Sequence, residues 1–166
     1  MTLVSHILLV VAFLAVLGRK SWGGTIYRVL GGRAVLWGFL VTLASILGSL
    51  FYSEIIGYEA CVLCWWQRVF LYPQMVIFAV ALWKRDSSPF KYIIPLAVLA
   101  LVIALYQVYA VDLGGVSLLS CTSAEGACSK IFVREFGYIT IPVMSATVSL
   151  YVLLLAWVHK LFRTNN

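Results

Sequence analysis

Charged residues are scarce in this sequence. They make up 11% of its 166 residues, whereas hydrophobic residues make up 63%. Ordinary globular domains carry about 25% charged residues, so a soluble domain of this length would have nowhere to put so much apolar surface. Strict alternation of apolar and polar residues is also lacking, which argues against the strands of a closed barrel. The composition therefore excludes a soluble domain, and the long apolar runs predict membrane-spanning helices.

Four apolar runs are long enough to cross about 30 Å of hydrocarbon, which takes roughly 20 residues of helix. The runs cover Ala34–Tyr52, Cys64–Trp83, Tyr92–Val111 and Tyr138–Val158. We therefore predict an all-α membrane protein that contains a four-helix transmembrane bundle.

A fifth apolar run, Leu3–Leu17, has no basic residue before it, whereas Arg19 and Lys20 follow it. This order of charge is the reverse of that in a secretory signal. At about 15 residues the run fits a short span or an interfacial helix. We predict an additional N-terminal hydrophobic helix that spans the membrane, followed by a cytoplasmic connector at Ser21–Arg33. The glycine pattern of this connector does not resemble that of a phosphate-binding loop.

Acidic residues number only six, and an up-and-down threading of the runs puts five of them on one side: Glu54, Glu59, Asp112, Glu125 and Glu135. Nine of the 12 basic residues lie on the other side: Arg19, Lys20, Arg28, Arg33, Lys84, Arg85, Lys91, Lys160 and Arg163. Basic residues in short loops mark the cytoplasmic side. The net charge of +6 is thus explained by membrane topology, and nucleic-acid binding is not predicted.

The sequence has four cysteines, and this threading puts all of them on the outer side: Cys61, Cys64, Cys121 and Cys128. Disulfides form and persist outside the cytoplasm, so two structural disulfides would explain them. However, a Cys-x-x-Cys disulfide closes a very small ring and constrains little chain. The same spacing occurs where thiol reactivity is tuned. A Cys₄ zinc site is a third interpretation, although six residues separate the second pair, more than zinc sites usually have.

Arg68 lies four residues after Cys64, and therefore one turn deeper on the same face of the predicted helix. A cation there would stabilise a thiolate or a reduced quinone oxygen, and ionisable residues inside a span suggest function. The alternative is an arginine that extends to the lipid headgroups from a helix end. Trp65 and Trp66 are interpreted as interfacial anchors, or as residues that pack against a quinone ring.

The stretch Cys61–Arg68 (CVLCWWQR) resembles the Cys-x-Leu-Cys, aromatic-rich, arginine-ending signature of the DsbB family of bacterial disulfide-bond formation proteins. Phe136–Pro142 (FGYITIP) is similar to that family's entry into its last helix. The resemblance covers about Ala34–Val158, and the compact second outer loop resembles that of the short-loop members. The N-terminal run is not part of the family pattern, so we divide the chain into three regions: the N-terminal hydrophobic helix and cytoplasmic connector (1–33), a four-helix DsbB-like redox domain (34–158) and a cytoplasmic tail (159–166).

The resemblance also implies a quinone-linked thiol oxidase of the bacterial inner (plasma) membrane. In the family, a soluble thioredoxin-fold dithiol oxidase, DsbA-like, delivers two electrons to the second-loop pair. The first-loop pair reoxidises the second and passes the electrons to a membrane quinone, ubiquinone or menaquinone. By this resemblance Cys121 forms the mixed disulfide with the partner, with Cys128 as its companion. Cys61 exchanges with the second pair, Cys64 is the quinone-proximal thiolate, and Arg68 lies beside the quinone.

Two positions depart from the family pattern. Gln67 stands where some members carry an acidic residue, and Tyr106–Tyr109 lacks the histidine that some relatives use near the quinone. Two other functions also remain open. One is a reductase of the vitamin K epoxide reductase type, which shares the four-helix, Cys-x-x-Cys logic. The other is a non-enzymatic membrane scaffold with two structural disulfides.

Overall fold

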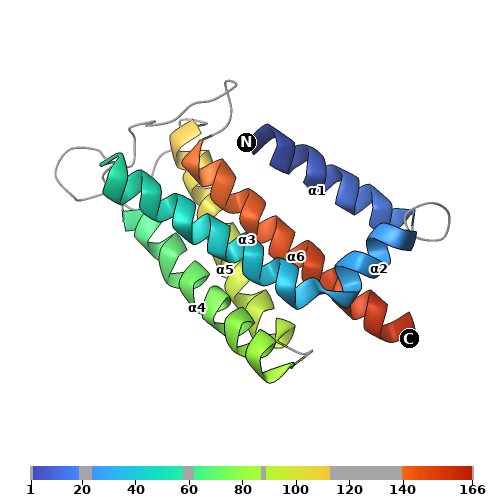
Figure 1. The fold of residues 1–166 in the computed structure, drawn as a ribbon. Coiled ribbons are helices and arrows are strands. Elements are labelled where there is room, and N and C mark those ends of the chain that lie inside the picture. The colour runs from blue at the N-terminus through green and yellow to red at the C-terminus, as the bar shows by residue number, and fades with distance from the viewer. Residues whose placement is uncertain (1, 19–23, 58–61, 87–88, 113–139, 166) are drawn as a thin grey trace.

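A computed structural model of the chain describes residues 2–18, 24–57, 62–86, 89–112 and 140–165 (Figure 1). The described part is helical and contains no strand, which confirms the predicted all-α fold. Its elements in chain order are α1 (Thr2–Leu17), α2 (Gly24–Gly32), α3 (Ala34–Leu50) with the π-helical turn η1 (Phe51–Ile55), α4 (Val62–Lys84), α5 (Phe90–Asp112) and α6 (Ile141–Asn165).

Helices α3 to α6 form a bundle in which each helix packs against the next and α6 packs back against α3 (Figure 1). Neighbouring helices are antiparallel. Arg68 near the start of α4 bonds to Ser49 near the end of α3. Phe78, nearer the end of α4, meets Phe90 at the start of α5 edge-on, with ring centroids 5.7 Å apart. The bundle therefore has two distinct ends, one near Arg68 and one near Phe90.

The core of the bundle is centred on Phe78, whose side chain is completely buried. A Cβ atom on Gly38 of α3 would overlap the Phe78 ring, so glycine allows α3 to approach α4 this closely. Helices in lipid associate through such close packing, because lipid is as apolar as the side chains. The surrounding cluster joins all four helices and consists of Ala34, Phe78, Phe90, Ile93, Ala97, Val152, Leu155 and Ala156.

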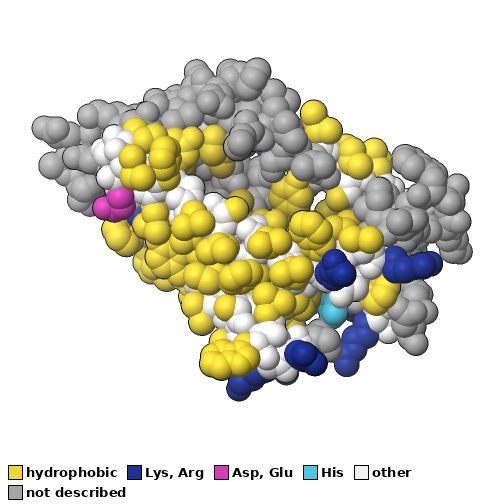
Figure 2. Space-filling view, viewed as in Figure 1, with side chains coloured by type: hydrophobic (Ala, Val, Ile, Leu, Met, Phe, Trp, Pro, Cys, Tyr) yellow, Lys and Arg dark blue, Asp and Glu magenta, His cyan; other side chains and the backbone are white. Residues whose placement is uncertain are grey.

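The surface of the bundle is apolar around its middle. Figure 2 shows hydrophobic side chains in a broad band across the helices, with basic side chains gathered at one end of it. Within the described residues, three helical stretches are long and apolar enough to cross a membrane: Ala34–Ile55, Phe90–Tyr109 and Ile141–Thr164. These stretches correspond to three of the four predicted spans.

The fourth predicted span, Cys64–Trp83, lies within α4, which is more polar than its neighbours. Its polar residues Gln67, Arg68 and Gln74 are buried inside the bundle, and exposed Val76 lies on an outer face. The helix has 23 residues and is therefore about 34 Å long, enough to cross the hydrocarbon. Its lower hydropathy thus comes from side chains that face protein.

Two boundaries differ from the prediction. The last apolar run was expected to end at Val158, but α6 continues to Asn165, and the expected connector Ser21–Arg33 contains the helix α2. These segments pack on one another: a Cβ atom on Gly31 of α2 would lie 2.7 Å from the Phe162 ring of α6. The apolar runs predicted neither α2 nor the last turns of α6, because contact between these two helices, rather than burial in lipid, stabilises them.

Helix α1 confirms the predicted N-terminal hydrophobic helix and packs against α2 and α6 (Figure 1). Two contacts fix its direction. His6 Nε2 lies 3.0 Å from Thr147 Oγ1, and the rings of Phe13 and Trp157 are 6.3 Å apart. Both residue numbers increase together, so α1 is parallel to α6. With 16 residues it is about 24 Å long, shorter than the hydrocarbon core, and its spanning the membrane stays a prediction.

Candidate functional site

Cys64 lies in the first turn of α4, at the end of the bundle near Arg68, and its side chain is half-buried. Its neighbour Leu63 is buried, and Cys64, Ile103 and Tyr106 pack against it. Ile103 and Tyr106 belong to α5, so the contact between α4 and α5 fixes the surroundings of the thiol. Cys64 therefore belongs to an apolar, partly aromatic cluster around Leu63.

A chain of two buried amides reaches the sulfur of Cys64. Gln107 of α5 donates from Nε2 to Cys64 Sγ over 3.6 Å. Gln67 of α4 donates in turn from Nε2 to Gln107 Oε1 over 2.8 Å. Both glutamines are almost completely buried, at 7% and 3% exposure for Gln67 and Gln107. Buried amides are costly unless they are paired, so this arrangement holds one N–H donor towards the thiol.

Arg68 is buried one turn further along α4, with 7% of its surface exposed. Its Nε donates to Ser49 Oγ over 2.9 Å and its Nη2 donates to the Ser49 carbonyl oxygen over 3.0 Å. The guanidinium carbon also lies 5.3 Å from the centroid of the Trp65 ring. Protein groups of α3 and α4 therefore hold this cation, in contrast to the alternative of an arginine extended to the headgroups.

The guanidinium keeps donors for another acceptor. Arginine carries five N–H donors, and Ser49 accepts two of them. Trp65 and Trp66 are 56% and 49% exposed, and the Trp66 ring stacks on Phe70 with centroids 6.2 Å apart. The tryptophans therefore present aromatic surface outward from the helix turn that carries Cys64.

Of the five predicted site residues, Cys64 and Arg68 lie together at one end of the bundle. Cys61, Cys121 and Cys128 lie outside the described residues, so the order of exchange among the four cysteines and the zinc alternative both stay untested. No group of three or more metal-binding side chains occurs in the described part.

Sequence reasoning missed two residues of the site, Ser49 and Gln107. Gln107 lies in the stretch that was noted only for lacking a histidine. The available signal was its polarity, because a buried amide in an apolar span needs a partner. Ser49 carried a weaker signal, since small polar residues are common at helix contacts in membranes.

These features define a class: an α-helical membrane protein with a cysteine thiol that accepts from a buried amide, and a buried arginine one helical turn further along, at one end of its bundle. The family model of the disulfide bond formation protein DsbB matches residues 31–159. The chain belongs to this family and is a multi-pass membrane protein. The matched region begins within α2 and ends within α6, so it includes α3 to α5 and most of α6, whereas α1 lies outside it.

Curated relatives agree with this assignment. The chain is 39% identical over 108 residues to the SPbeta prophage-derived disulfide bond formation protein B of Bacillus subtilis, covering 65% of this chain and 72% of the relative. It is 41% identical over 113 residues to a probable disulfide formation protein of Chlamydia pneumoniae, covering 68% and 80%. It is 32% identical over 126 residues to a probable disulfide formation protein of Coxiella burnetii, covering 75% and 86%. No solved structure matches the chain significantly.

Proposed function

We propose that this protein is a quinone-linked thiol–disulfide oxidoreductase. It reoxidises an extracytoplasmic thioredoxin-fold dithiol oxidase and thereby supports disulfide bond formation. The observation that carries the proposal is the hydrogen bond from the buried Gln107 amide to Cys64, together with buried Arg68 one helical turn away. A purely structural disulfide needs neither a donor aimed at its sulfur nor a cation beside it. Membership of the DsbB family supports the same role.

The residues around Cys64 fit a quinone, ubiquinone or menaquinone. Ile103 and Tyr106 pack against Leu63, as Cys64 does, and so provide an apolar, partly aromatic cluster for a quinone ring. Arg68 keeps N–H donors that could bond a quinone oxygen. A bound quinone supplies an acceptor for two electrons and two protons. The protein would place the thiolate, hold it with Gln107 and provide the cation.

Thiol exchange carries the electrons towards this acceptor. The dithiol of the partner reduces the Cys121–Cys128 disulfide through a mixed disulfide at Cys121, and the partner leaves oxidised. The reduced second pair then reduces the Cys61–Cys64 disulfide and regains its own disulfide. Each step is attack of a thiolate on a sulfur with departure of another thiolate, so one bond forms as one breaks. The two electrons then leave the first pair from Cys64.

The charge distribution supports an orientation with the cysteines outside the cytoplasm. Lys84, Lys91, Lys160 and Arg163 lie near the helix ends opposite the one that carries Cys64. Figure 2 shows basic side chains gathered at one end of the apolar band. Basic residues mark the cytoplasmic side of a bacterial inner membrane. Cys64 would then face the compartment in which a thioredoxin-fold oxidase works.

Quinone-dependent oxidation of a reduced thioredoxin-fold protein tests the proposal. Purified protein should oxidise the partner and reduce quinone in equal amounts, and Cys64→Ser should abolish both. A reductase of the vitamin K epoxide reductase type would instead use thiols to reduce an epoxide. A scaffold would do neither. Partner oxidation that persists in Cys64→Ser would contradict the proposed electron path.

A further inference from the structure

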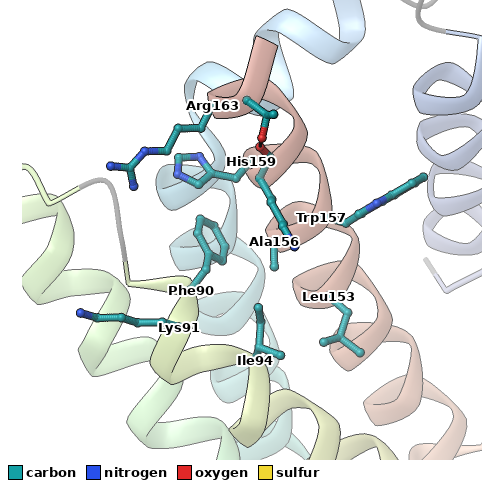
Figure 3. A pocket seen from close by; sticks show the side chains of 10 residues that line it. Phe90, Lys91, Ile94, Leu153, Ala156, Trp157, His159 and Arg163 are labelled. Atoms are coloured by element: carbon teal, nitrogen blue, oxygen red, sulfur yellow. Dashed lines mark hydrogen bonds between the residues drawn. The ribbon is translucent and has the colours of Figure 1, made fainter. Parts of the chain in front are cut away.

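A cavity lies between α5 and α6 (Figure 3). It is at the end of the bundle away from Cys64. Its volume is about 690 Å³. The first turns of α5 and the last turns of α6 line it, so it is close to where both helices leave the apolar middle of the bundle. The redox function proposed above makes no use of this cavity.

The mouth of the cavity is basic. Lys91 of α5 and Lys160 and Arg163 of α6 line it, all three are exposed, and the lining includes no acidic residue. Lys91 Nζ lies 4.8 Å from the centroid of the Tyr92 ring, a contact that positions the ammonium group without neutralising it. Figure 3 shows Lys91 and Arg163 extending to the same side, past the Phe90 ring. The mouth therefore suits an anion.

Deeper positions of the same cavity are apolar. Along α6 the lining changes from Arg163 and Lys160 to Trp157 and Leu153, residues three or four apart that share one helix face. On α5 it changes in the same direction, from Lys91 to Ile94. Ile94 and Trp157 are each 41% exposed, so this apolar lining is open to the surrounding lipid. The lining of the cavity therefore changes from basic to apolar along both helices.

We propose that this cavity binds an anionic phospholipid. Lys91, Lys160 and Arg163 take the phosphodiester headgroup, and an acyl chain lies along Ile94 and Leu153. Basic pockets between membrane helices suit such headgroups, and each basic residue near the surface strengthens binding about fivefold. A free phosphate would use the basic mouth alone. The apolar continuation towards the membrane interior favours an occupant that carries an acyl chain.

The test compares lipid retention by the purified full-length protein. The protein in neutral detergent is mixed with equal amounts of phosphatidylglycerol and phosphatidylcholine with identical chains, and native mass spectrometry counts the lipids that stay bound. The wild type should retain phosphatidylglycerol selectively. The triple variant K91Q/K160Q/R163Q should lose this selectivity by about tenfold or more. Unchanged selectivity in this variant would overturn the proposal.

A matched variant separates the cavity from the general positive charge of this end. R28Q/R33Q/K84Q removes the same number of charges from exposed positions that do not line the cavity. It should retain phosphatidylglycerol as the wild type does. An equal loss in both triple variants would mean diffuse attraction, and the proposed site would be wrong. Circular dichroism checks that each variant keeps its helical content.

Two further measurements identify the occupant. Ile94→Trp fills the apolar part while leaving the three cations, and it should reduce phosphatidylglycerol retention. Excess inorganic phosphate should leave retention by the wild type unchanged. If phosphate displaces the lipid, or if Ile94→Trp retains it fully, the cavity is a simple anion site and the lipid proposal fails. None of these measurements involves quinone or a thiol partner, so the outcome is independent of the proposed redox function.

Discussion

Gln107 of α5 donates a hydrogen bond to the sulfur of Cys64 on α4, with 3.6 Å between Nε2 and Sγ. The other end of the same amide accepts from Gln67 over 2.8 Å, so its orientation is fixed. A flipped Gln107 would place its oxygen against the thiol and its N–H groups against another donor. This coupling between two glutamines means that each affects the cysteine, although only one contacts it.

Gln107→Leu should slow turnover with quinone by about tenfold or more, because a hydrogen bond to a charged group contributes about 1.5–3 kcal/mol. In a background with the other three cysteines replaced by serine, alkylation of Cys64 should slow as well. Gln74→Leu is the matched control, since Gln74 is a buried glutamine of α4 that bonds only its own helix at the Phe70 carbonyl oxygen. Equal alkylation rates in wild type and Gln107→Leu would show that the amide does not support the thiolate.

The two glutamines should be energetically coupled. Gln107→Leu alone leaves the Gln67 amide buried without its acceptor, whereas the double change Gln67→Leu/Gln107→Leu removes both partners. Thermal unfolding in detergent should therefore show a loss of stability in the double variant that is smaller than the sum of the single losses, by about 1 kcal/mol. Strict additivity would count against a direct bond between them.

Arg68→Ala should weaken the use of quinone while thiol exchange between the cysteine pairs continues. Arg68→Lys should be milder, because lysine keeps the charge but lacks the planar fork that bonds both Ser49 oxygens. Ser49→Ala should give a smaller defect of the same kind, since it removes one acceptor and keeps the cation. Quinone titrations of the turnover rate measure the effect. Unchanged apparent quinone affinity in Arg68→Ala would refute the assignment.

Variants of the two cysteine pairs should stop thiol exchange at different steps. Cys128→Ser removes the companion of Cys121, so a mixed disulfide between Cys121 and the partner should accumulate. Cys64→Ser should instead leave the second pair reduced by the partner and not reoxidised, because sequential exchange stops at the bond before the missing thiol. Non-reducing gels with a dithiol partner distinguish the two states. A trapped adduct through Cys61 would reverse the proposed order.

All four cysteines should face the extracytoplasmic side, and the Lys84–Lys91 link should face the cytoplasm. The basis is the segregation of basic residues to one end of the bundle. After reduction of intact cells, a membrane-impermeant thiol reagent should label the cysteines, whereas a cysteine introduced at Ser87 should react only after permeabilisation. The opposite labelling pattern would mean that the cysteines face the cytoplasm, where an extracytoplasmic partner could not reach them.

The helices of the bundle were predictable because lipid demands continuous apolar sequence, whatever the neighbouring helix is. Helix α2 and the last turns of α6 were not, because Gly31 and Phe162 stabilise each other across segments far apart in sequence. The residues of the candidate site were likewise predictable only in part. Local spacing marks Cys64 and Arg68, but which residue faces them depends on how α3 and α5 are rotated. Polarity marked Gln107, and more weakly Ser49, as residues that need a partner, but no local pattern encodes the rotation, so which residues they bond emerged only from the fold.

The position of α1 makes two sides of the bundle different. Helix α1 packs against α6, whereas Cys64 and its partners lie where α4 meets α5 and α3. Among the described helices, α1 therefore covers the α6 side of the bundle and not the side that carries Cys64. A molecule that diffuses in the bilayer and reaches Cys64 would therefore not have to displace α1.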